Sequence, residues 1–178
     1  DGTTGDWSDA THWTPNGVPG AFDTASISNG TVNLSNGVQV AVLNLAAGKI
    51  GGAGALNVRS NGIWLAGQMF GSGKTLISSN AVVTISGGTE KNLDRSLDNY
   101  GTIQWTGARI TSDSSPTVKN FAGALFDMQA DANLFESFTS TPGTLINYGT
   151  VRRSGSGTVV VAGTFQNNGT VDTRSGLL

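Results

Sequence analysis

Short alternations of apolar and polar residues recur along most of the chain. In the segments 31–34 (Thr-Val-Asn-Leu) and 38–42 (Val-Gln-Val-Ala-Val), an apolar side chain returns at every second position. A period of two is typical of β-strands, because successive side chains of a strand point to opposite faces of the sheet. The pattern therefore predicts a protein built from many short strands.

Two phrases repeat along the sequence. One is Gly-x-Gly followed by an apolar strand, at 52–56, 71–76 and 155–159. The other is an apolar residue, then Asn, then small residues and a second apolar residue. It occurs at 97–103, 145–151 and 165–171, and in degraded form at 118–124. The shared asparagines of this second phrase are Asn99, Asn120, Asn147 and Asn167.

A repeat of about 20 residues with strand-forming content favours a solenoid in which each repeat is one coil. A β-sandwich also has closely spaced strands, but its successive strands have no reason to repeat the same turn phrase. In a parallel β-helix, equivalent positions stack about 4.8 Å apart and share one conformation. The asparagines are expected at corners, in a left-handed backbone conformation, with their amides bonded from coil to coil. We predict an all-β, single-stranded parallel β-helix of about seven coils, right-handed as parallel crossovers usually are.

The two ends of the chain differ from its middle. Residues 1–28 contain Trp7 and Trp13 and a turn-rich cluster at 15–20, and we interpret them as a cap on the β-helix formed by residues 29–178. The chain begins without Met and stops within a strand-like pattern, so we expect a piece of a longer protein that is truncated at its C-terminal end. Unpaired strand edges there predict end-to-end self-association. Segment 127–142 fits the coil pattern poorly and is expected to form a loop.

Composition narrows the functional classes. Gly accounts for 26 of the 178 residues and Glu for only two, so a helical bundle is excluded. Twelve acidic and ten basic residues are scattered without runs, which argues against a nucleic-acid partner. No apolar run approaches the roughly 18 residues of a membrane span, and no cysteine is present. We expect no membrane insertion by this chain and no thiolate chemistry.

Most candidate catalytic motifs fail on spacing. Segment 71–75 (Gly-Ser-Gly-Lys-Thr) resembles a phosphate-binding loop, but the required earlier glycine is replaced by Gln68 and a strand follows. The only histidine, His12, lies in the turn-rich N-terminal segment without a serine elbow. No calcium-loop spacing is present. We therefore expect no metal, no cofactor and no nucleophilic triad.

Two surface chemistries remain open. Paired carboxylates can cleave polysaccharides without His or Cys, and two groups of residues qualify: Asp94 and Asp98 with Arg95, and Asp127 and Asp131 with Glu136. Aromatic rings suit sugar binding. Tyr100 and Tyr148 occupy the same phrase position and should lie along one side of the helix, and Trp64 and Trp105 lie in other coils. The alternative is that these aromatic residues pack at corners.

The N-terminal segment carries a resemblance. Residues 5–15 (Gly-Asp-Trp-Ser-Asp-Ala-Thr-His-Trp-Thr-Pro), with Gly17-Val18-Pro19 and Asp23-Thr24-Ala25-Ser26-Ile27, are similar to the phrase that opens β-helical repeat regions in large bacterial surface proteins of the adhesin-like, autotransporter-associated type. Segment 93–105 is similar to the coils that follow it there. The resemblance implies a β-helix in an extracellular or cell-surface setting, and it implies no catalytic residues.

Together these observations predict a non-enzymatic structural or adhesive module of a larger secreted or surface protein. Its partners would be extracellular glycans or proteins. The alternative is a carbohydrate-binding or polysaccharide-processing β-helix domain, in which Tyr100, Tyr148, Trp105 and Trp64 contact the sugar.

Overall fold

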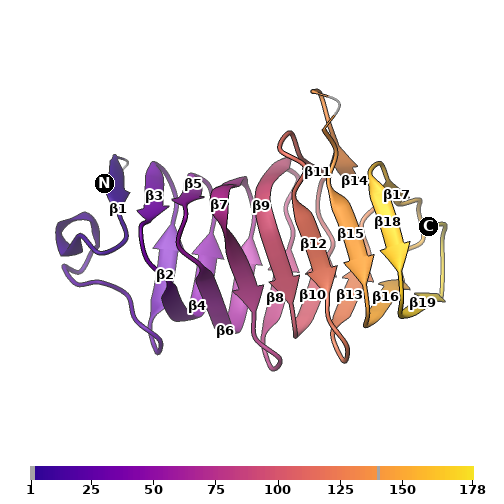
Figure 1. The fold of residues 1–178 in the computed structure, drawn as a ribbon, viewed down its shortest axis with the longest axis horizontal. Coiled ribbons are helices and arrows are strands. Elements are labelled where there is room, and N and C mark those ends of the chain that lie inside the picture. Colours follow the sequence, from indigo (N-terminus) through magenta and orange to yellow (C-terminus); the bar gives the residue numbers. More distant parts are fainter. Residues whose placement is uncertain (1–2, 140) are drawn as a thin grey trace.

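The chain winds into a three-sided parallel β-helix (Figure 1). The computed structural model describes residues 3–139 and 141–178. All paired strands run parallel, each bonded to the strands one coil before and one coil after it. The all-β parallel solenoid predicted from the sequence is confirmed, whereas its handedness stays a prediction.

Strands of successive coils stack into three faces. The first face contains β2 (Thr24–Ile27), the second halves of β4 (Val38–Leu45) and β6 (Leu56–Trp64), and then β8 (Val82–Ile85), β10 (Thr102–Trp105), β13 (Leu125–Met128), β16 (Thr150–Arg153) and β19 (Thr170–Thr173).

The second face begins one coil earlier. It contains β1 (Thr4–Asp6), β3 (Thr31–Leu34), β5 (Lys49–Gly52), the first halves of β7 (Gly67–Ile77) and β9 (Lys91–Asn99), β11 (Ile110–Thr111), β14 (Asn133–Glu136) and β17 (Val160–Val161). The third face contains the first halves of β4 and β6, the second halves of β7 and β9, and β12 (Thr117–Asn120), β15 (Thr144–Asn147) and β18 (Thr164–Asn167).

Coil length varies while the register is kept. In the described chain the third face has seven strand segments, in agreement with the predicted coil number. Equivalent first-face positions are 18 residues apart between Thr24 and Val42, and 25 apart between Leu125 and Thr150. The extra residues lie in the corners, because the strands must stay paired while a loop can lengthen at little cost.

The interior is filled by columns of side chains. One column on the first face runs through Ile27, Leu45, Trp64, Ile85, Trp105 and Met128, all at most 4% exposed. Large and small members alternate, which lets neighbouring coils interdigitate. Burial of these columns and the continuous backbone ladders hold the coils together.

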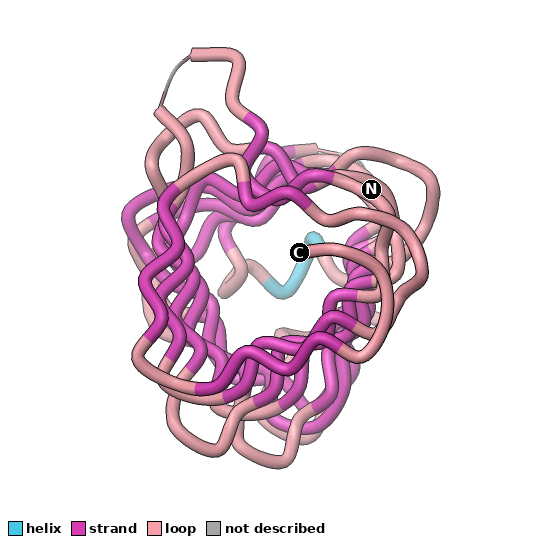
Figure 2. Tube along the Cα trace, turned by 90° about the vertical axis from the view of Figure 1, so that its right-hand side faces the viewer, coloured by secondary structure: helices cyan, strands magenta, loops and turns pink. Residues whose placement is uncertain are grey.

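The N-terminal segment folds across the end of the tube. Its single turn of 3-10 helix (Ala10–His12) lies within the outline of the three faces when the molecule is viewed along its axis (Figure 2). Trp7 is 1% exposed, and its ring meets Trp13 edge-on at 4.8 Å between centroids. β1 and β2 already pair with the β-helix inside residues 1–28. The stabilising role of the segment as a cap stays a prediction.

The segment 127–142 is not the loop expected from the sequence. It contains the end of β13 and the whole of β14, which pair with β16 and β17. The alternation was obscured because Phe135 has a positive φ of 64° and is fully buried, which turns two successive side chains of β14 inward.

Candidate functional site

The four repeat asparagines form one ladder at the corner between the third and first faces. Asn99, Asn120, Asn147 and Asn167 are register partners at the ends of β9, β12, β15 and β18. Asn99 Nδ2 donates to Asn120 Oδ1 at 2.8 Å, Asn120 Nδ2 to Asn147 Oδ1 at 2.8 Å, and Asn147 Nδ2 to Asn167 Oδ1 at 2.7 Å. The first three are completely buried.

Each ladder amide also holds the corner of the coil above. Asn120 Nδ2 donates to the carbonyl of Thr150 at 3.0 Å, and Asn147 Nδ2 to that of Thr170 at 3.0 Å. Such bonds satisfy buried polar groups on both partners. The amides of Asn120 and Asn147 therefore each bond the next coil at two points.

The backbone conformation expected for these asparagines is wrong. Among described residues other than glycine, only Ser115 and Phe135 have a positive φ. The asparagines end ordinary strands, so their hydrogen bonds and not a left-handed turn explain why they recur. The repeated glycine has a different cause: a Cβ on Gly149 would lie 2.4 Å from the backbone oxygens of Phe121 and Ala124.

The ladder begins where an apolar column ends. Val40, Val58 and Ile77 occupy the same register position in the three coils before Asn99. These residues are buried. One corner is thus apolar in the N-terminal half of the helix and amide-bonded in the C-terminal half.

Only two of the four aromatic residues proposed for sugar contact are at the surface. Trp64 and Trp105 are 1% and 0% exposed. The indole of Trp64 donates to the carbonyl of Ala66, and that of Trp105 to the carbonyl of Ala108. Their proposed role in ligand contact is wrong, because inward positions of the first face bury them. Tyr100 and Tyr148 are 39% and 47% exposed and follow Asn99 and Asn147, the first and third members of the ladder.

The first carboxylate group is divided between two faces. Asp94 pairs in register with Phe70 on the second face, and Asp98 with Leu76 on the third. β9 bends around the corner between them, and Arg95 at the bend is 2% exposed. Asp98 accepts a hydrogen bond from Lys74 at 2.9 Å. The two carboxylates therefore do not form an acid–base pair.

The second carboxylate group is also dispersed. Asp127 lies on the first face and accepts from Ser154 Oγ at 2.6 Å. Asp131 lies in the following corner and accepts from the amide of Thr158 at 2.8 Å, whereas Glu136 ends β14 on the second face. Each of these side chains links one coil to another.

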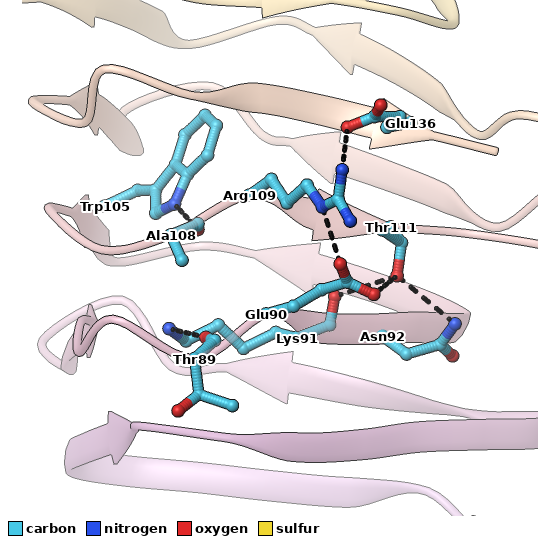
Figure 3. A network of polar contacts seen from close by, with 9 residues as sticks. All are labelled: Thr89, Glu90, Lys91, Asn92, Trp105, Ala108, Arg109, Thr111 and Glu136. Carbon is cyan, nitrogen blue, oxygen red and sulfur yellow. Dashed lines mark hydrogen bonds and ion pairs between the residues drawn. The ribbon is translucent and has the colours of Figure 1, made fainter.

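Glu136 belongs to a different cluster, which spans three coils of the second face (Figure 3). Arg109 Nε lies 2.5 Å from Glu90 Oε2, and Arg109 Nη1 lies 3.0 Å from Glu136 Oε2. Thr111 Oγ1 lies within 3.4 Å of Glu90 Oε1 and accepts from Asn92 Nδ2 at 3.4 Å. The sequence pattern gave no sign of this cluster, because Arg109 lies 19 residues from Glu90 and 27 residues from Glu136 along the chain.

The ion pair with Glu90 favours the charged form of Arg109. The hydrogen bond from Arg109 to Glu90 is the main cause that raises the pKa of Arg109 above its ordinary value. The side chains of Arg109, Glu90 and Glu136 are 41%, 39% and 32% exposed, and exposed ion pairs contribute little stability. The Arg109 guanidinium engages the carboxylates of both Glu90 and Glu136. The cluster therefore links neighbouring coils and does not present a free acid and a free base.

Three cations are buried in the helix, a feature that the sequence analysis missed. Lys91 Nζ donates to the carbonyls of Gly87 and Thr89 at 3.1 and 2.7 Å, and burial lowers the pKa of Lys91. Arg153 bonds three carbonyls through its three nitrogens. Arg95 bonds two through Nη2 alone, while its Nε and Nη1 have no partner, and burial lowers the pKa of Arg95 to about 10.

The remaining motifs offer no catalytic geometry. Segment 71–75 lies within strand β7, where a phosphate-binding loop would require a helix. His12 Nδ1 has no hydrogen-bond partner and lies 3.9 Å from Asp9 Oδ2. Over residues 3–139 and 141–178, no three His, Cys, Asp or Glu side chains gather as metal ligands would. In the same ranges, no helix has the length and apolarity to span a membrane.

Cavities at the surface of the described residues include one beside the N-terminal segment and one beside Tyr100. The larger, of about 580 Å³, lies between the N-terminal segment and strands β2 and β3, and Trp13, Asp23, Ser26 and Thr31 are among its lining residues. The smaller, of about 290 Å³, lies beside Tyr100. Comparisons with protein-family models, with curated proteins and with solved structures gave no significant match to this chain.

Proposed function

We propose that this chain is a non-enzymatic structural or adhesive module of a larger extracellular or cell-surface bacterial protein. One observation carries the proposal: the carboxylates that could perform catalysis are engaged in contacts between coils. Glu90 and Glu136 share Arg109, and Asp98 pairs with Lys74. Function then resides in the length of the solenoid and in its surface. The surface setting rests on the resemblance of residues 5–27 to the opening of adhesin-like repeats.

The proposal is tested with the purified chain on two kinds of assay. Beads coated with it are exposed to immobilised extracellular glycans and matrix proteins, with heat-denatured chain as the control. The same chain is incubated with soluble polysaccharides, and new reducing ends and unsaturated products are measured. We expect retention that needs the folded chain and no cleavage. Polysaccharide cleavage that disappears in Glu136→Gln would overturn the non-enzymatic proposal.

A second candidate function, carbohydrate binding, is favoured by one surface feature. Tyr100, Phe121 and Tyr148 follow three successive members of the asparagine ladder, so they occupy equivalent corner positions, which we call the aromatic column. The rings of Tyr100 and Phe121 stack. Both tyrosines are more than a third exposed. An exposed column of rings supports contact with the apolar faces of sugars, and a glycan array with the intact chain tests it.

A further inference from the structure

The ring of Tyr100 is fixed by its neighbour in the aromatic column. It stacks on Phe121 with 4.1 Å between centroids and 13° between planes, and Lys119 Nζ lies 5.7 Å from the Phe121 centroid on the third face. Stacking covers one face of the tyrosine ring and restricts its rotation. A ring held in this way loses little conformational entropy when a ligand contacts its other face.

The other face of the Tyr100 ring is open, because the equivalent position one coil earlier holds a small residue and not an aromatic one. The amide of Tyr100 donates to the carbonyl of Ile77 at 2.9 Å, so the corner position one coil earlier is Ser78. A serine is too small to cover an aromatic ring. The cavity of about 290 Å³ fills this place and is lined by Asn57, Leu76, Ser78, Ser79 and Tyr100.

The lining combines apolar and polar groups. The ring of Tyr100 and the side chain of Leu76 are apolar, and amide and hydroxyl groups come from Asn57, Ser78 and Ser79. Ser78 Oγ donates to Asn57 Oδ1 at 2.9 Å, which orients the amide and leaves Asn57 Nδ2 as a donor. Pockets of this kind use a few placed polar groups to orient a mostly apolar contact.

This combination matches one chemical class. A hexopyranose has an apolar face of C–H groups, which suits the negative face of an aromatic ring, and a rim of hydroxyls that need donors and acceptors. We propose that the Tyr100 cavity is a subsite for one neutral hexopyranose unit of a polysaccharide. The inference rests on the carbohydrate-binding function proposed above and assigns it a position and a ligand class.

The surrounding charges favour a neutral sugar over an acidic one. Apart from the Tyr100 phenol, the lining residues carry no ionisable side chain. On the neighbouring third face, Lys74 and Asp98 pair with each other at 2.9 Å, and Lys119 lies beside the Phe121 ring. An acidic sugar would find no free cation among the lining residues and would lie near the Asp98 carboxylate.

The test is a nuclear magnetic resonance titration of the intact chain with neutral hexasaccharides of glucose, mannose and N-acetylglucosamine. Acidic oligogalacturonate serves as the charged comparison. We expect at least one neutral sugar to bind with a Kd on the order of 1 mM, with amide shifts centred on residues 57, 76–79 and 100. Tyr100→Ala should weaken binding by about tenfold or more. Phe22→Ala is the control, because it removes an exposed aromatic ring that lines neither cavity, and it should change Kd by less than about twofold.

A second variant separates loss of the subsite from loss of local structure. Ser79→Leu changes an exposed lining residue and fills the cavity while Tyr100 and Phe121 stay in place, so it should abolish the same shifts. Neutral-sugar binding that survives both variants, or shifts at Trp13 and Ser26 in the larger cavity instead, would overturn the subsite and leave carbohydrate binding standing. Preference for oligogalacturonate would overturn the neutral ligand class. Absence of shifts with every sugar would overturn both the subsite and the carbohydrate-binding function.

Discussion

Replacement of Asn120 by Leu is the sharpest test of the ladder. The two side chains are similar in size, so the change removes hydrogen bonds without opening a large cavity. Asn120 Nδ2 donates to Asn147 Oδ1 at 2.8 Å and to Thr150 O at 3.0 Å, and Asn120 Oδ1 accepts from Asn99 Nδ2 at 2.8 Å. All three asparagines are fully buried, so water does not reach the groups left behind.

The expected cost follows from those groups. Asn147 Oδ1 loses its donor, and Asn99 Nδ2 keeps only its bond to Leu125 O at 3.0 Å. A buried polar group left without a partner costs about 1–3 kcal/mol. Burial of the apolar leucine offsets part of this, by about 1–2 kcal/mol. We expect the free energy of unfolding of Asn120→Leu to fall by about 2–3 kcal/mol.

Urea denaturation followed by circular dichroism measures this loss. Asn167→Leu is the matched control, because Asn167 ends the ladder and is exposed, so water replaces the lost bonds. Its free energy of unfolding should fall by less than about 1 kcal/mol. Equal shifts of the denaturation midpoint for the two variants, or a wild-type midpoint for Asn120→Leu, would refute the reasoning that burial gives the ladder its stabilising effect.

Three further predictions concern other parts of the helix. Arg95→Met should leave the free energy of unfolding unchanged or raise it by about 1 kcal/mol, because two guanidinium nitrogens of Arg95 are buried without partners. Arg153→Met leaves three carbonyls unpaired and should lower the free energy of unfolding by about 1–3 kcal/mol. Urea denaturation in which Arg95→Met is the more destabilising of the two would contradict this contrast. Hydrogen bonds from Ser35 and Ser8 lower the pKa of Asp6 to about 2. The stabilising contribution of the Asp6 carboxylate is therefore present above about pH 4 and lost between about pH 4 and 2. Hydrogen exchange of backbone amides should show selective opening of β1 in that pH range. Deletion of residues 1–28 should lower the melting temperature and promote aggregation, and a monomeric truncated chain with unchanged melting would contradict the cap.

The asparagine ladder separates what could be predicted from what could not. Recurrence of Asn two positions before a small residue pointed to equivalent positions on successive coils, and the structure places these asparagines in register. The prediction of a left-handed backbone was wrong. An Asn whose amide bonds along the stack, followed by a Gly packed against a carbonyl, has the same sequence pattern as an Asn-Gly turn. The phrase itself does not say which of these causes applies.

The aromatic residues and charges show a second limit. Trp64, Trp105, Tyr100 and Tyr148 look alike as isolated aromatic residues in separate coils, yet the first two are buried and the last two are exposed. Whether an aromatic side chain points into the core or to the surface depends on its position relative to the corners of its coil. The coils vary in length, so spacing counted along the chain does not locate the corners.

Local sequence by itself determined the strand content, the repeat and the parallel stacking, because alternation and recurring turn phrases act within one coil or between adjacent ones. Only the tertiary structure decided which side chains meet. β9 bends between Asp94 and Asp98 and sends them to different faces, and coil stacking brings Glu90, Arg109 and Glu136 together. The cavity beside Tyr100 likewise depends on Ser78 lying one coil below a ring that Phe121 holds from above. The physical reason is that contacts between coils depend on the register of residues about 20 positions apart, and that register is set by packing of the whole stack.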